Sequence, residues 1–197
     1  MKQIFLSLVL SAFTLFGFAN SPHIDRVRVD NQKSTIKWVG SKITGSHDGF
    51  VQIEKGMLLI NHGTLAGGEV NIDMTSITCS DIESERKNKY LVDHLKDEDF
   101  FHVEKHPVST IKIIKAIKKE ANNYQIVADL TIKGITNSIT FDAEVNIRKI
   151  AFFCKAKIKI DRTRWDVTYK SGSFFKELGD KAILDEIEFE INLLSAR

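Results

Sequence analysis

The sequence predicts an all-β fold built from antiparallel strands. Apolar and polar residues alternate over most of the chain, as they do in strands that bury one face. Glycines separate many of the alternating segments by short turns, which join antiparallel neighbours rather than parallel ones. With 197 residues, 43% of them hydrophobic, the chain is long enough for one domain with a sizeable core.

The alternation is strongest in the second half of the chain. Four segments there place aliphatic or aromatic residues at every second position, with mostly polar or charged residues between them. They predict strands over residues 124–132, 137–148, 150–160 and 187–193. Several of these exceed the usual strand length of about five or six residues. The pattern alone leaves two architectures open, a sandwich of two sheets and one sheet closed into a barrel.

The first half of the chain has weaker strand signals and one helix signal. Strands are expected over residues 35–39, 49–53, 57–60, 65–74 and 108–117. Ser80 and Glu83 have the spacing of a capping box, which predicts a short helix inserted around residues 81–95.

The N-terminal residues 1–19 have the layout of a secretory signal peptide. Lys2 precedes an apolar run over residues 4–18, and small residues stand before a cleavage position after Ala19. A membrane anchor is the alternative, but the run is shorter than the ~20 residues that span a bilayer. We therefore expect a single mature domain over residues 20–197 that is periplasmic or secreted.

Export would allow a disulfide, because disulfide bonds persist in oxidising compartments. Cys79 and Cys154 do not have the spacing of a redox or metal motif, and Cys154 falls on the apolar phase of its predicted strand. We expect two free, buried thiols, with a disulfide between the two cysteines as the alternative.

The charge pattern argues against a nucleic-acid partner. The formal charge is only +2, from 28 basic and 26 acidic residues, so there is no strong overall field. A local basic stripe is expected from Lys155, Lys157, Lys159, Arg162 and Arg164. The stripe predicts a solvated outer face, with transient membrane contact through anionic headgroups as the alternative. The oligomeric state is left open, a homodimer included.

Several motifs, taken in their order along the chain, carry a family resemblance. They are Trp38-Val39-Gly40, residues 67–77, residues 90–107 with their adjacent Phe-Phe, the turn 130–136, and residues 161–165. Over about residues 29–194 the chain resembles the YceI-like family of periplasmic polyisoprenoid-binding proteins, whose fold is a lipocalin-like barrel. Asp166 and Lys170 depart from the pattern, since smaller residues, often glycine, are expected there.

The resemblance implies an extended antiparallel lipocalin-like β-barrel of about eight strands that holds an isoprenoid-type lipid, such as a polyprenyl chain or a quinone precursor. An apolar lumen too wide for its side chains to fill would favour such a guest over water. No catalytic residue, metal or cofactor is required. The expected lining residues are Trp38, Phe50, Val70, Ile72, Phe100, Phe101, Phe141, Val145, Phe152, Ile158 and Trp165. If Phe100 and Phe101 lie on a strand, only one of them can point inward, whereas if they follow the end of the helix, both can form a lid.

Two other functions are open at this stage. A metal-binding stress protein would use the histidines of one segment, which are His94, His102 and His106. An enzyme acting on a barrel-bound lipid would need polar side chains inside the lumen, for which the best candidates are His47, Arg164 and Tyr169.

Overall fold

The structure, a computed structural model, describes residues 23–149 and 151–196. The signal peptide expected at residues 1–19 lies outside the described residues. The described chain forms nine strands: β1 (Ile24–Arg28), β2 (Thr35–Lys42), β3 (Gly45–Asn61), β4 (Thr64–Asp73), β5 (Val108–Lys118), β6 (Asn123–Ile132), β7 (Ile135–Arg148), β8 (Ala151–Asp161) and β9 (Ile183–Leu194). Its helices are η1 (Met74–Ser76), α1 (Glu85–Lys96), η2 (Arg162–Trp165) and η3 (Gly179–Lys181).

Eight of these strands close into an antiparallel barrel. The sheet runs in the order β3-β2-β9-β8-β7-β6-β5-β4, and β3 also pairs with β4, which joins its two edges. The predicted barrel is therefore confirmed and the sandwich is excluded. The ninth strand, β1, lies against the second half of β3. The sequence does not predict β1, because three of its five residues are charged and only Val27 is buried.

β3 is one strand of 17 residues where the sequence predicts two. Its register against β4 shifts between Ile53 and Lys55, which marks a β-bulge. Val51 and Ile53 are buried before the shift, and Leu58 and Ile60 are buried after it. The bulge thus changes which positions face inward, and this change of phase makes one continuous strand look like two in the sequence.

The connection from η1 to α1 runs back along the first half of β3. The Thr78 N–H donates to the Phe50 carbonyl (2.9 Å), and the Ser80 N–H donates to the Asp48 carbonyl (2.8 Å). A Cβ atom added at Gly49 would lie 1.8 Å from the Thr78 carbonyl oxygen. Only a glycine at this position of β3 allows the connection to approach so closely.

Helix α1 begins four residues later than the sequence predicts, so the proposed capping box of residues 80–83 is wrong. The Asp81 carboxylate is already engaged: it bonds His47 Nδ1 at 2.8 Å and accepts from the Asp48 N–H at 3.0 Å. Residue Ser84 takes the N-cap position, and its side chain makes no capping hydrogen bond.

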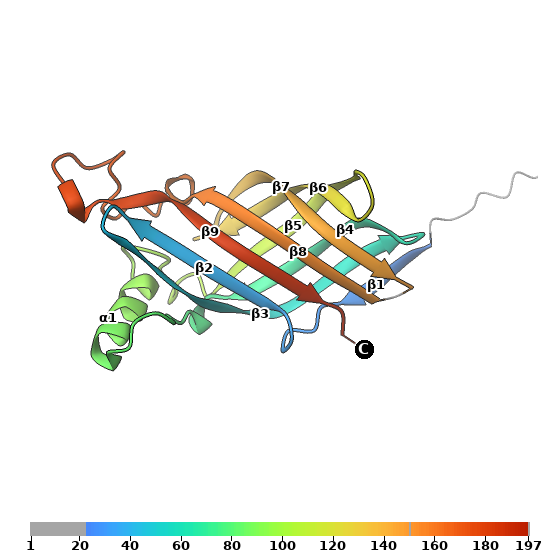
Figure 1. The fold of residues 1–197 in the computed structure, drawn as a ribbon, viewed down its shortest axis with the longest axis horizontal. Coiled ribbons are helices and arrows are strands. Elements are labelled where there is room, and N and C mark those ends of the chain that lie inside the picture. The colour runs from blue at the N-terminus through green and yellow to red at the C-terminus, as the bar shows by residue number, and fades with distance from the viewer. Residues whose placement is uncertain (1–22, 150, 197) are drawn as a thin grey trace, which may run out of the picture.

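The two ends of the barrel differ (Figure 1). Helix α1, the β2–β3 turn and the long β8–β9 connection gather at one end, which we call the helix end. The β3–β4, β5–β6 and β7–β8 turns and the C-terminus lie at the other, which we call the far end. No helix of the described residues is long and apolar enough to cross a membrane.

Two residues of the β8–β9 connection that depart from the family pattern lie in the left-handed backbone region. They are Asp166, with φ 58°, and Lys170, with φ 48°. Both stand where the resemblance leads us to expect small residues, and the observed dihedrals are those that glycine adopts without strain. The chain therefore keeps a glycine-type backbone at both positions although it has larger side chains there.

Both cysteines are free and buried, as the sequence predicts. Burial raises the pKa of the Cys154 thiol to about 12. The pKa of Cys79 is also raised, first by burial and then by the hydrogen bond to Asp81. Because the thiolate is the reactive form, neither sulfur is set up as a nucleophile.

Candidate functional site

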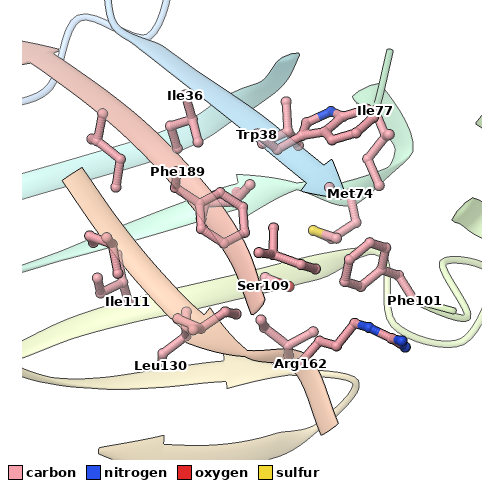
Figure 2. A pocket seen from close by; sticks show the side chains of 18 of the residues that line it. Ile36, Trp38, Met74, Ile77, Phe101, Ser109, Ile111, Leu130, Arg162 and Phe189 are labelled. Atoms are coloured by element: carbon pink, nitrogen blue, oxygen red, sulfur yellow. The ribbon is translucent and has the colours of Figure 1, made fainter. Parts of the chain in front are cut away.

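The barrel encloses a cavity of about 510 Å³ whose walls are almost entirely apolar. In Figure 2, Trp38, Leu130 and Phe189 point from different strands toward the same space. On β8 the alternation is complete: residues such as Ala156 and Ile158 line the cavity, while the lysines between them face outward. The inward side chains therefore do not meet in the middle.

Eight of the eleven residues expected to line the lumen do line this cavity. They are Trp38, Val70, Ile72, Phe100, Phe101, Phe141, Val145 and Ile158. The indole of Trp38 is held in place because its Nε1–H donates to the Thr78 carbonyl at 3.1 Å. Contact of these residues with a bound ligand stays a prediction.

Three of the expected residues do not line the cavity. Phe50 is 43% exposed on the outer face of β3, because its neighbours Gly49 and Val51 occupy the inward phase. Trp165 is fully buried in η2, outside the lumen, where its Nε1–H donates to the Leu130 carbonyl at 2.9 Å. Phe152 points inward but lies beyond the end of the cavity.

Bulky side chains close the far end of the cavity. On β8 the last lining residue is Cys154, and Phe152, two positions further, is buried. On β6 the last lining residue is Ile126, and Tyr124, again two positions further, is buried. The cavity is therefore blind at this end. The alternation places Tyr124 on the inward face, but it gives no indication of how deep the cavity reaches.

Aromatic side chains cover part of the helix end. The N–H of Phe101 donates to the Leu95 carbonyl at 3.2 Å, so both phenylalanines follow directly on the end of α1 and both line the cavity. The rings of Phe100 and Tyr169 pack against the His94 ring, with centroid distances of 5.0 Å and 4.6 Å. This cluster joins the segment after α1 to the β8–β9 connection.

Arg162 also lines the cavity, although the sequence places it on an outer basic stripe. Its side chain is buried and donates to the carbonyls of Leu184 (3.1 Å), Val167 (2.6 Å) and Ile183 (3.1 Å), and it pairs with Asp185 at 3.4 Å. Burial lowers the pKa of Arg162, and Asp185 opposes that shift. The guanidinium thus ties the start of the β8–β9 connection to the start of β9.

Two lysines of the basic stripe are paired with carboxylates. Lys157 pairs with Glu190 at 2.6 Å, and Lys159 pairs with both Glu186 and Glu188 at 2.8 Å. These hydrogen bonds to carboxylates raise the pKa of both lysines. These two lysines therefore form a ladder of cross-strand ion pairs on the barrel wall rather than a free cationic surface.

The His47–Asp81 pair lies beside the cavity at the helix end. Burial alone would raise the pKa of Asp81, but hydrogen bonds from His47, the Asp48 N–H and the Cys79 thiol lower it to about 2. Because His47 lies on β3 and Asp81 on the connection that precedes α1, the pair fastens that connection to the barrel.

The histidines of the metal-binding alternative do not converge. His94 packs against Tyr169, while the rings of His102 and His106 pack edge to face with centroids 5.8 Å apart. Within residues 23–149 and 151–196, no group of three His, Cys, Asp or Glu side chains is placed to hold a metal ion.

Only two of the three side chains proposed for an enzyme line the cavity. His47 and Tyr169 line the cavity, but Arg164 lies outside it. The Arg164 guanidinium stands 5.2 Å from the Trp165 ring centroid and donates to the Ser138 carbonyl at 3.1 Å. The three side chains therefore do not form one catalytic group.

Solved structures with the same fold are known. A Burkholderia cenocepacia protein, BcnA, aligns with a TM-score of 0.65 at 19% identity, over 85% of this chain and 99% of its own. A polyisoprenoid binding domain from Saccharophagus degradans aligns with a TM-score of 0.62 at 12% identity, over 89% of this chain and 98% of its own. At such identities the likeness concerns the fold.

Sequence comparisons agree with the fold. A UPF0312 protein of Staphylococcus epidermidis is 40% identical over 83 residues, which are 40% of this chain and 45% of that protein. A UPF0312 protein of Staphylococcus aureus is 35% identical over 106 residues, 54% of each chain. The chain spans about half the length of the curated relatives it matches. The model of the YceI-like domain matches residues 28–194, nearly the whole barrel, and the chain therefore belongs to the YceI-like family.

Proposed function

We propose that this protein is an exported carrier that sequesters one isoprenoid-type lipid in its barrel. The observation that carries the proposal is the blind, almost wholly apolar cavity of about 510 Å³. Such a volume falls within the range of roughly 300–1,000 Å³ typical of small-molecule sites. An apolar cavity of this kind disfavours water and favours an apolar guest.

The shape of the cavity fits a chain rather than a compact ligand. Lining residues on β8 and just after it run from Cys154 to Arg162. Eight steps of about 3.3 Å, on a strand tilted by ~40°, span ~20 Å along the barrel axis, the length of roughly four extended isoprene units. Each buried carbon contributes up to about 0.8 kcal/mol, so the chain itself supplies the affinity. Binding on this basis needs no catalytic step.

The family and the fold support this proposal. The Saccharophagus degradans neighbour is described as a polyisoprenoid binding domain. Export is supported by the apolar run in residues 4–18, which is followed by the small residue Ala19. If export is correct, the intact mass of the protein from its own cells corresponds to a chain that starts at Asn20.

The direct test is native mass spectrometry and organic extraction of the protein purified from its own cell envelope. We expect one prenyl lipid per barrel, released by solvent. The extracted protein should then take up geranylgeraniol, which has four isoprene units. A barrel that arrives empty and also fails to bind geranylgeraniol would refute the proposal.

A further inference from the structure

Exposed apolar side chains gather beside the opening of the cavity. Ile43, in the β2–β3 turn, is 64% exposed, and Phe174, in the β8–β9 connection, is 60% exposed. Phe175 and Leu184 nearby are also exposed. Exposed apolar side chains that lie close together commonly mark a surface that contacts another molecule or a membrane.

The backbone holds these residues together as one surface. On β2, Lys42 pairs with Ile183 of β9, and Ser171 forms a bridge to the same Ile183. The N–H groups of Phe174 and Phe175 both donate to the Ser171 carbonyl, at 3.2 Å and 2.9 Å. The turn that carries Ile43 and the loop that carries the two phenylalanines are thus neighbours at the helix end.

Lysines surround the apolar groups. Residues 42–44 and 170–182 contain Lys42, Lys170, Lys176 and Lys181, against the acidic residues Glu177 and Asp180, which gives four positive and two negative charges. None of the four lysines forms an ion pair with another of the described residues, unlike Lys157 and Lys159 on the barrel wall. This surface, which we call the rim, therefore combines exposed apolar groups with unneutralised positive charge.

We propose that the rim docks the barrel on an anionic lipid bilayer, with Ile43, Phe174 and Phe175 entering the headgroup region. Apolar side chains flanked by lysines suit that interface, because the rings leave water while the ammonium groups meet lipid phosphates. A bilayer is favoured over a protein partner because Lys42, Lys170, Lys181 and Leu184 also line the cavity, so the rim is continuous with its opening. The role of docking rests on the proposed function: a docked barrel would let a prenyl chain pass between the bilayer and the lumen without crossing water.

The test is vesicle flotation, comparing phosphatidylcholine vesicles with vesicles that also contain phosphatidylglycerol. The wild-type protein should float only with the anionic vesicles and should be released by salt. Ile43→Ser and Phe174→Ser should each weaken binding roughly tenfold, because each removes an inserted apolar side chain. Lys176→Glu should weaken it by at least roughly fivefold, the effect expected for losing one lysine near an anionic surface. None of these three side chains lines the cavity.

Matched controls exist at the far end. Phe153 is 40% exposed on the outer face of β8, and Lys119 is exposed in the β5–β6 turn. Phe153→Ser and Lys119→Glu should leave flotation unchanged. Equal losses from rim and far-end variants, or no flotation of the wild type, would overturn the docking proposal. Geranylgeraniol uptake in vesicle-free buffer tests the proposed function separately, because the rim variants should bind it like the wild type.

Discussion

Replacing Phe141 by glutamate tests the claim that the lumen is apolar and water-poor. Phe141 lines the cavity on β7, opposite Ile126 of β6. A glutamate with an ordinary pKa of about 4.3 must be protonated before a lipid can cover it, and at pH 7 this costs about 3.7 kcal/mol, at 1.36 kcal/mol per pH unit. The lost phenylalanine contact adds up to about 1.5–3 kcal/mol. We therefore expect the affinity for geranylgeraniol to fall by at least ~100-fold at pH 7.

The same reasoning predicts a pH dependence that the wild type lacks. Between pH 7 and about pH 5, the affinity of Phe141→Glu should recover nearly tenfold per pH unit, because protonation of the new carboxyl costs less as the pH falls. Trp38 lines the cavity, so its fluorescence reports uptake during a titration. The control is Asp142→Ala, at an exposed position on the outer face. Equal losses in both variants would show that the strand phase is wrong, and unchanged binding by Phe141→Glu at pH 7 would show that the lumen holds water.

Three further predictions concern the far end, the Asp81 pair and the buried thiol. Phe152→Ala should shift the preferred prenol to a longer chain, and Ala143→Leu, which fills the end of the cavity, should shift it to a shorter one; a competition series of farnesol, geranylgeraniol and longer prenols measures the shift. An unchanged preference in both variants would contradict the blind end. Since the pKa of Asp81 is lowered from 3.8 to about 2, its stabilisation is present above pH ~4 and is lost as the pH falls toward 2. Asp81→Asn should reduce the free energy of unfolding in urea by about 1 kcal/mol at pH 7, after allowing for solvent screening, and by much less near pH 2; a difference independent of pH would refute the assignment. Cys154 lines the apolar cavity, so it should react with a charged thiol reagent, which such a cavity excludes, only at the rate of unfolding, and fast labelling of the folded protein by that reagent would contradict its burial.

The walls of the cavity could be predicted because strand periodicity is a local property. On β8, alternation from Cys154 to Ile160 specifies which side chains face inward, whatever the rest of the chain does. The expectation that Phe50 faces inward is wrong because Val51 and Ile53, at alternate positions, hold the inward phase of β3 and Phe50 falls between Val51 and Gly49. The bulge after Ile53 adds to the difficulty, since it reverses the phase within one strand.

The two ends of the cavity could not be predicted in this way, because they depend on residues that are distant in sequence. Arg162 is expected outside, on a stripe of basic residues, yet carbonyls of Ile183 and Leu184, some twenty positions later, hold it at the helix end. Phe152 has the inward phase of a lining residue, but depth along the barrel axis comes from register with the neighbouring strands, and no periodicity encodes it. If the proposed function is correct, the far end sets the length of the bound chain and the helix end sets where the chain is exchanged. Family members that carry different lipids should then differ at these two ends rather than along the walls of the cavity.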